Sequence, residues 1–279
     1  MKQFILLAAG ILLTISLIAK NNQTINVATY NIRYNGQSDG VNAWPNRKGH
    51  VKALIRYHEF DIFGTQEGLI DQIKDLDEME EFDYTGSGRD DGKEEGEHSA
   101  IFYRKDRFRL LDSGNFWLSE TPEKPSFGWD AQNHRRICSW AKFKDLLLKT
   151  EFYFFSVHFD HRGVEAQFQS GTLMVEKIKE IAGKLPVICV GDFNSTPETR
   201  QIQKMKTLLN DSYDISEMPP YGPVGTFNNF DYNAKMEHRI DYIFVSAQIK
   251  VLKYGVLTDS YQLRFPSDHH PVVAKVKLK

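Results

Sequence analysis

The chain has 279 residues, of which 41% are hydrophobic and 26% are charged. This composition allows a large folded core and excludes a disordered, collagen-like or coiled-coil chain. Lys and Arg number 35 against 37 Asp and Glu, a formal net charge of -2, so no excess of positive charge indicates a nucleic-acid-binding surface. The two cysteines, Cys138 and Cys189, are too few for a disulfide framework and lack zinc-site spacing. We therefore expect one large domain that depends on its hydrophobic core.

The first 19 residues have the layout of a secretory signal. Lys2 precedes an apolar stretch from Phe4 to Ala19, which is somewhat short for a bilayer span and is followed at once by polar residues. We expect a signal peptide over residues 1–19, an exported domain over residues 20–279, and no membrane span once the signal is removed. The cleavage position stays open, because Leu17 and Ala19 match the small-residue rule only in part. An uncleaved N-terminal membrane anchor is the alternative.

Short apolar, β-branched and aromatic runs recur along the rest of the chain and predict strands. They are Ile25 to Ile32, Asp61 to Gln66, Ser99 to Tyr103, Ile137 to Phe143, Phe152 to His158, Val187 to Val190, Arg239 to Val245 and Pro271 to Val276.

Two stretches between these strands have helical periodicity. One places Val51, Leu54, Ile55 and His58 on one face, and the other runs from Val164 to Ala182. Each would cover a sheet. The predicted fold is α/β, with mixed sheets packed together and helices on their outer faces.

Two segments are strongly acidic. Residues 71–83 hold seven acids against the single Lys74, and residues 90–97 hold five more together with Gly92 and Gly96. The pattern favours a solvated helix face and a mobile loop over a metal cluster. These segments would repel a polyanion.

Polar residues stand at the ends of the predicted strands, where α/β sheets present functional groups to a crevice. They are Asn31, Glu67, His158, Asp192 with Asn194, Asp241, and the segment Ser267 to Pro271. Taken singly, Asn31 and Asp192 fit turn or cap residues, and Glu67 fits a helix cap. A carboxylate such as Asp241, flanked by Ile240 and Ile243, is costly to bury without a partner. Together, the six sites favour a functional cluster over coincidence.

The ordered motifs resemble those of the endonuclease/exonuclease/phosphatase superfamily, which includes deoxyribonuclease I, neutral sphingomyelinases and inositol-polyphosphate 5-phosphatases. The motifs are Thr29-Tyr30-Asn31, Gln66-Glu67, Val157-His158, Gly191-Asp192-Phe193-Asn194, Arg239-Ile240-Asp241-Tyr242 and Ser267-Asp268-His269-His270-Pro271. The resemblance spans residues 25 to 278. It implies a four-layer α/β sandwich, with two packed mixed sheets and helices outside, that hydrolyses phosphoesters with a divalent metal.

Oxygen donors suit Mg²⁺, with Mn²⁺ as a possible substitute. By the resemblance, Glu67 is the first expected metal ligand, and Asn31 and Asp268 lie close to it. The sequence does not decide whether one or two ions are bound.

The same resemblance implies the catalytic side chains. Asp192 would activate the attacking water, Asn194 would bind a phosphate oxygen, and His158 and His269 would stabilise developing charge. Asp241 would orient His269. We expect His270 to be structural.

For several neighbouring residues, the sequence allows either a contact with the substrate or a purely structural role. Arg135 and Arg136 precede the strand from Ile137, and Arg136 is the favoured phosphate contact. Trp44, Trp129 and Trp140 are candidates to line a cleft, although the 19 Phe and 12 Tyr of the chain favour a core position for at least one of them. His98 is a candidate to reach the cleft.

The leading hypothesis is thus an exported, monomeric phosphoesterase that acts on a small or headgroup-type phosphoester. A secreted endonuclease or exonuclease is the alternative. Further alternatives are an inactive binding module and a metal-free glycoside hydrolase using Glu67 and Asp192 as paired carboxylates.

Overall fold

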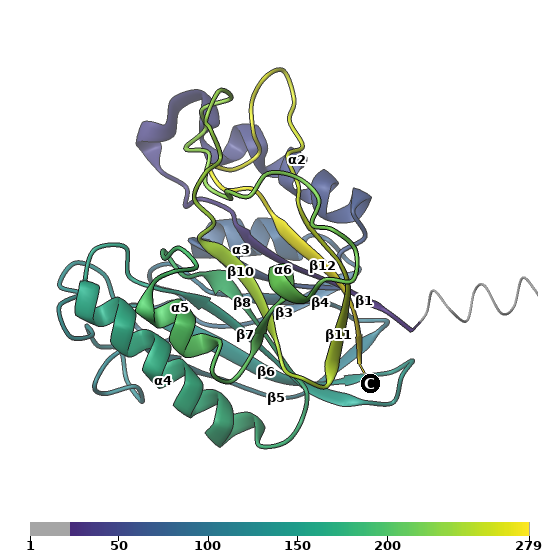
Figure 1. Ribbon diagram of the computed structural model, residues 1–279. Helices are drawn as coiled ribbons and strands as arrows, with labels where there is room; N and C mark the ends of the chain where they lie inside the picture. The colour runs from purple at the N-terminus through teal and green to yellow at the C-terminus, as the bar shows by residue number, and fades with distance from the viewer. Residues whose placement is uncertain (1–22, 279) are drawn as a thin grey trace, which may run out of the picture.

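Two six-stranded mixed sheets face each other and carry helices on their outer faces (Figure 1). The computed structural model describes residues 23–278. The four layers run helices, sheet, sheet, helices. This confirms the predicted α/β sandwich.

The first sheet has the strand order β11-β12-β1-β2-β4-β3. Its strands are β1 (Ile25–Asn31), β2 (Ile62–Gln66), β3 (Phe82–Thr85), β4 (Ile101–Arg104), β11 (Ile249–Val256) and β12 (Val272–Leu278). The central strand β1 pairs in parallel with β2 and antiparallel with β12. The 3-10 helix η1 (Gln37–Asn42) and the helices α2 (Trp44–Tyr57) and α3 (Ile70–Asp77) follow β1 and β2. Apolar side chains of α2 and α3 pack on the outer face of this sheet.

The second sheet has the order β5-β6-β7-β8-β10-β9. Its strands are β5 (Phe108–Trp117), β6 (Ile137–Asp145), β7 (Glu151–His158), β8 (Val187–Asp192), β9 (Asn210–Asp211) and β10 (Asp241–Val245). Helix α4 (Val164–Ala182) connects the parallel pair β7 and β8, and α4 packs with α5 (Arg200–Met205) on the outer face. The short α6 (Ser212–Ile215) follows β9.

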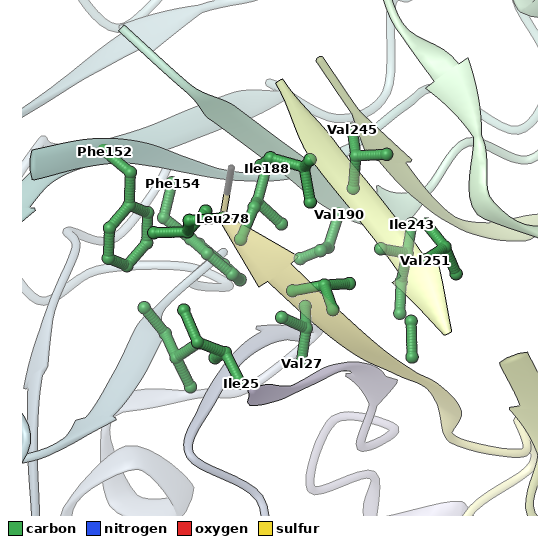
Figure 2. Close-up of a cluster of buried hydrophobic side chains, with 14 of the residues drawn as sticks. Ile25, Val27, Phe152, Phe154, Ile188, Val190, Ile243, Val245, Val251 and Leu278 are labelled. Carbon is green, nitrogen blue, oxygen red and sulfur yellow. The ribbon is translucent and has the colours of Figure 1, made fainter. Parts of the chain in front are cut away.

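The main core lies between the sheets (Figure 2). Ile25 and Val27 of β1 point into it, whereas Ala28 and Tyr30 face the helices on the other side. A strand that is buried on both faces needs apolar residues at nearly every position, which is the pattern seen in the sequence. The sheets approach closely at Gly64, where a Cβ atom would lie 2.5 Å from the Ser156 Oγ.

All eight predicted strands are present, with ends shifted by at most two residues, and the predicted helix 164–182 has the observed bounds. Helix α2 ends at Tyr57, so His58 lies just beyond it and pairs with Asp259 rather than continuing the helical face. The strands β3, β5, β9 and β11 were not predicted. The expected signal peptide lies outside the described residues. Within residues 23–278, no helix has both the length and the apolar character needed to cross a membrane.

Candidate functional site

Strand topology gathers the predicted site residues at one edge of the molecule. β7 and β8 are parallel, and β10 runs antiparallel to β8, so the register places His158 beside Asp192 and Asp192 beside Asp241. Asn31 ends β1 of the other sheet, and its Nδ2 donates to the Asp192 Oδ2 at 3.0 Å. This hydrogen bond joins the two sheets at the site.

Asp192 is the centre of the cluster. The residue is 1% exposed, and its Oδ1 accepts from the backbone N–H of Asn194 at 2.8 Å. The Nε2 atoms of His158 and His269 lie 3.5 and 3.8 Å from its Oδ2. Burial, reinforced by the charge of Asp241 and opposed by His269, raises the pKa of Asp192 to about 7. A carboxylate with this pKa can accept a proton near neutral pH.

His269 is paired with a buried carboxylate. Its Nδ1 lies 2.9 Å from the Asp241 Oδ2, which also accepts from the Thr226 hydroxyl at 2.6 Å. Burial disfavours the cation, yet the carboxylates of Asp241 and Asp192 outweigh burial and hold the pKa of His269 well above its ordinary value. His269 is therefore an imidazolium whose Nε2–H is turned toward Asp192.

His158 has the opposite protonation state. Burial and the nearby Arg136 and Arg89 hold its pKa well below the ordinary value, so the ring is neutral. The Arg136 Nη1 lies 3.1 Å from its Nδ1, and a guanidinium only donates, so the ring proton belongs on Nε2. The Nδ2 of Asn194 lies 3.1 Å from that same Nε2. The Nε2–H of His158 and the Nδ2 of Asn194 therefore lie close enough for one oxygen atom to accept from both.

The residues expected to bind a metal supply oxygen donors around Arg33. The Glu67 Oε1 accepts from the Asn31 Nδ2 at 3.0 Å, and the Arg33 guanidinium lies 3.7 Å from Glu67 and 3.8 Å from Asp268. Burial raises the pKa of Asp268 to about 6; His269 and Arg33 oppose this effect, and Glu67 adds to it. A divalent cation would offset the mutual repulsion of these clustered, buried carboxylates.

Ligand atoms of two overlapping groups lie close together. The groups are Glu67 with His158 and Asp192, and Asp192 with Asp241 and His269, with all atoms of each group within 4.8 Å of one another. Both histidines are engaged by other side chains, so the carboxylates are the members of these groups that fit a divalent cation. Of the three expected metal ligands, Glu67 belongs to one of these groups, and Asn31 and Asp268 lie beside it. The backbone supports this arrangement with left-handed conformations at Arg33, Glu67 and Asn194, at φ 55°, 64° and 45°. Such strained conformations concentrate at functional sites.

Glu97 is a site neighbour that the sequence analysis missed. Its carboxylate lies 2.5 Å from the Arg89 Nη1 and 3.7 Å from the His158 Nδ1, and burial raises its pKa although Arg89 opposes the shift. A mobile loop was expected over residues 90–97, but backbone hydrogen bonds and the ion pair of Arg89 with Glu97 order this segment. Gly92 and Gly96, at φ 74° and 80°, instead form a tight turn that brings Arg89 and Glu97 together. Only the single arginine ahead of the acidic run hinted at this pair.

The expected core position holds for at least one tryptophan. Trp44, the first residue of α2, is buried and donates to Asp75, and Trp140 packs against Tyr153 in the outer layer, so the cleft-lining alternative is wrong for these two. Trp129 is partly exposed on the loop between β5 and β6.

The remaining candidates divide between contact with the cluster and structural roles. Arg136 contacts His158 as described, whereas Arg135 pairs with Asp90 at 3.3 Å. His98 is buried with its Nδ1 3.2 Å from the Gly68 carbonyl, and it borders the same small pocket as Arg136 and His158. His270 is buried against the Phe265 ring, and burial lowers its pKa to about 4.

Comparison with known proteins identifies the relatives of this chain. The profile of the Endonuclease/Exonuclease/phosphatase family matches residues 28–269. The chain belongs to this family.

Solved structures of family proteins are similar over almost their whole lengths. An endonuclease/exonuclease/phosphatase family protein of Bacteroides thetaiotaomicron is 46% identical, with a TM-score of 0.89, and the match covers 92% of this chain and 98% of that one. A mannosyl-6-phosphatase of the same species is also 46% identical, with a TM-score of 0.87 and coverage of 90% and 99%. A family protein of Bacteroides vulgatus is 39% identical, with a TM-score of 0.88 and coverage of 92% and 99%. Family membership makes this chain a phosphoesterase in the broad sense.

Proposed function

We propose that the protein is a Mg²⁺-dependent hydrolase of small phosphoesters that uses in-line attack by water. The observation that supports this most is the central Asp192, buried with a pKa of about 7 between a neutral and a cationic histidine. A base that is half ionised near neutral pH, beside donors of two kinds, suits proton removal from water and stabilisation of a phosphoryl group.

Each side chain has a defined task in this proposal. Asp192 orients the water and takes its proton. The Nε2–H of His158 and the amide of Asn194 donate to one phosphoryl oxygen, and the His269 imidazolium stabilises the charge that develops on the phosphoryl group. Asp241 keeps His269 protonated and oriented.

Two further groups hold the phosphate in place. Arg136 fixes the His158 ring and adds positive charge for substrate binding. Glu67, Asn31 and Asp268 would hold the Mg²⁺ ion, which supplies positive charge to the phosphoryl oxygens.

The favoured substrate is a phosphomonoester of a small alcohol or sugar. The mannosyl-6-phosphatase is 46% identical over nearly the whole chain, which supports a phosphatase over a nuclease. A secreted nuclease remains the second candidate because the same donors would hold a nucleic-acid phosphate. We propose that the protein acts as a monomer.

A panel of phosphomonoesters and phosphodiesters, assayed with and without Mg²⁺, tests the function. Hydrolysis should require Mg²⁺ or Mn²⁺ and stop with excess chelator. The Asp192→Asn variant should retain the fold and lose about a hundredfold or more in rate, because it lacks the base. Full activity in chelator would remove the metal from the mechanism and favour paired-carboxylate chemistry. Near-normal turnover of the variant would make Asp192 structural.

We also propose export directed by residues 1–19, because Lys2 is followed by the apolar run from Phe4 to Ala19. Protein purified from its native host should begin near Lys20 on N-terminal sequencing. An intact Met1 in soluble cytoplasmic protein would contradict export, and an intact Met1 in the membrane fraction would indicate an anchor.

A further inference from the structure

Two exposed histidines, His134 and His161, lie outside the catalytic cluster and are linked to His158 through a closed series of side-chain contacts. Arg136 contacts the Nδ1 of His158 at 3.1 Å through Nη1 and the Nδ1 of His161 at 2.9 Å through Nη2. The rings of His161 and His134 lie 5.8 Å apart, and the His134 Nδ1 lies 3.2 Å from the Arg89 Nη2. Glu97 contacts both Arg89 and His158 and so completes the series.

This geometry fixes the tautomers of His134 and His161. A guanidinium has no acceptor, so each Nδ1 that faces an arginine must be the unprotonated acceptor. The ring proton is then on Nε2, on the far side of each ring from its arginine. Both residues are exposed. They therefore present two fixed N–H donors beside the phosphate site.

Both rings are neutral donors. Partial burial and the positive charges of Arg89 and Arg136 lower the pKa of His134. Partial burial and Arg136 likewise lower the pKa of His161, although Asp160 opposes the shift.

Each arginine behind the two rings already faces a carboxylate on its other side. Arg89 pairs with Glu97 at 2.5 Å, and Arg136 lies 3.5 Å from Asp160. Arg135, next along the chain from His134, is paired with Asp90 and lies against the exposed Phe127 ring at 4.6 Å. A second phosphate would therefore meet neutral donors and charges already paired. Hydroxyl groups carry no charge and can accept from neutral donors, so they match the cluster better than a second anion does.

We propose that His134 and His161 form a subsite that binds hydroxyl groups on the alcohol part of the phosphoester, and that this part is a sugar. The inference rests on the proposed function, because it takes the phosphate to lie at His158. One sugar ring is wide enough to reach both imidazoles, and the Phe127 face supplies an apolar surface at the same rim. The pair thus selects a polyhydroxylated leaving group over an aryl or alkyl one.

The test uses two double variants of the full protein. His134→Asn with His161→Asn keeps an acceptor near each Nδ1 position but removes the outward donor. His134→Gln with His161→Gln restores a donor near each Nε2 position. Gln132→Ala, an exposed change on the same loop, is the matched control.

The readout is the ratio of kcat/KM for hexose 6-phosphates to kcat/KM for 4-nitrophenyl phosphate. The leaving group of 4-nitrophenyl phosphate carries no hydroxyl group other than the one released from the ester. The Asn pair should lower this ratio about tenfold to a hundredfold for two lost hydrogen bonds, the Gln pair should recover part of it, and Gln132→Ala should leave it unchanged. An unchanged ratio in the Asn pair would overturn the subsite, and so would equal losses on both substrates. A larger loss on hexose 1,6-bisphosphate than on the 6-phosphates would also overturn it, in favour of an anion site.

Binding separates this inference from the proposed hydrolase. The affinity of the Asp192→Asn protein for hexose 6-phosphates, measured by calorimetry, should weaken about tenfold or more when the Asn pair is added. If this weakening is observed but the protein hydrolyses none of the esters, the sugar subsite is supported and the proposed hydrolase activity is rejected. Turnover of phosphoesters with no effect of the Asn pair on binding or ratio would keep the hydrolase and reject the subsite.

Discussion

His158 and His269 are both buried, and burial disfavours the charged form of each ring, so their charged partners decide the difference between them. Both side chains are almost fully buried and both lie within 4 Å of Asp192. His158 faces Arg136 and loses its proton, whereas His269 faces Asp241 and keeps its proton. One carboxylate is thereby flanked by a neutral donor and a cation, which suits a reaction in which negative charge grows on the phosphoryl group.

The Asp241–His269 pair is expected to act as one unit. Asp241→Asn should lower the pKa of His269 and remove its charge at neutral pH, and His269→Ala removes the ring itself. Each single change should cost on the order of a hundredfold in kcat/KM on a simple phosphoester, and the double variant should be little worse than the weaker single variant. Thermal melts of the three proteins control for folding. Multiplication of the two losses in the double variant would show that the residues act independently.

At the scale of elements, β7 and β8 position the site by close backbone contact. A Cβ atom on Gly191 would lie 2.1 Å from the Val157 carbonyl oxygen of the neighbouring strand. Gly191→Ala should therefore force β8 outward, lower the free energy of unfolding by about 1–3 kcal/mol or more, and displace Asp192. Urea unfolding and rate measurements check both effects.

Gly49 supplies the matched control for that change. It lies inside α2 with open space where a Cβ would stand, so Gly49→Ala should stabilise the protein by up to about 1 kcal/mol. If Gly191→Ala were as stable and active as Gly49→Ala, the packing of β7 against β8 would not constrain the site.

The elements also show how far the sequence predicts the structure. Continuous apolar runs identified the central strands, because strands buried on both faces have that pattern. Strand β5 was missed because it is an edge strand with a bulge between Leu110 and Asp112, and its middle is polar. The gathering of strand-end residues such as Asp192 could be predicted because these residues end regular strands that pair with one another. The positions of Arg89 and His134 could not be predicted, because they depend on irregular turns and on partners far along the chain.

At the scale of the whole molecule, charge bears on the class of substrate. Without Lys2, the exported chain would carry 34 basic against 37 acidic side chains, a formal charge of −3. Several arginines near the site are paired with acids, as in Arg89 with Glu97 and Arg33 with Asp39. These paired arginines are poorly suited to follow a long phosphate backbone.

This balance predicts a preference for small phosphoesters over nucleic acid. A polymer binder that neutralises many phosphates releases counterions, so its affinity falls steeply as salt rises. A small substrate held by a few local contacts should show a much weaker dependence. The measurement compares kcat/KM for short soluble phosphoesters with cleavage of duplex and single-stranded DNA and RNA across a salt series. We expect efficient turnover of the small esters with a shallow salt slope and little polymer cleavage. Efficient polymer cleavage that falls steeply with salt would instead make this family member a nuclease.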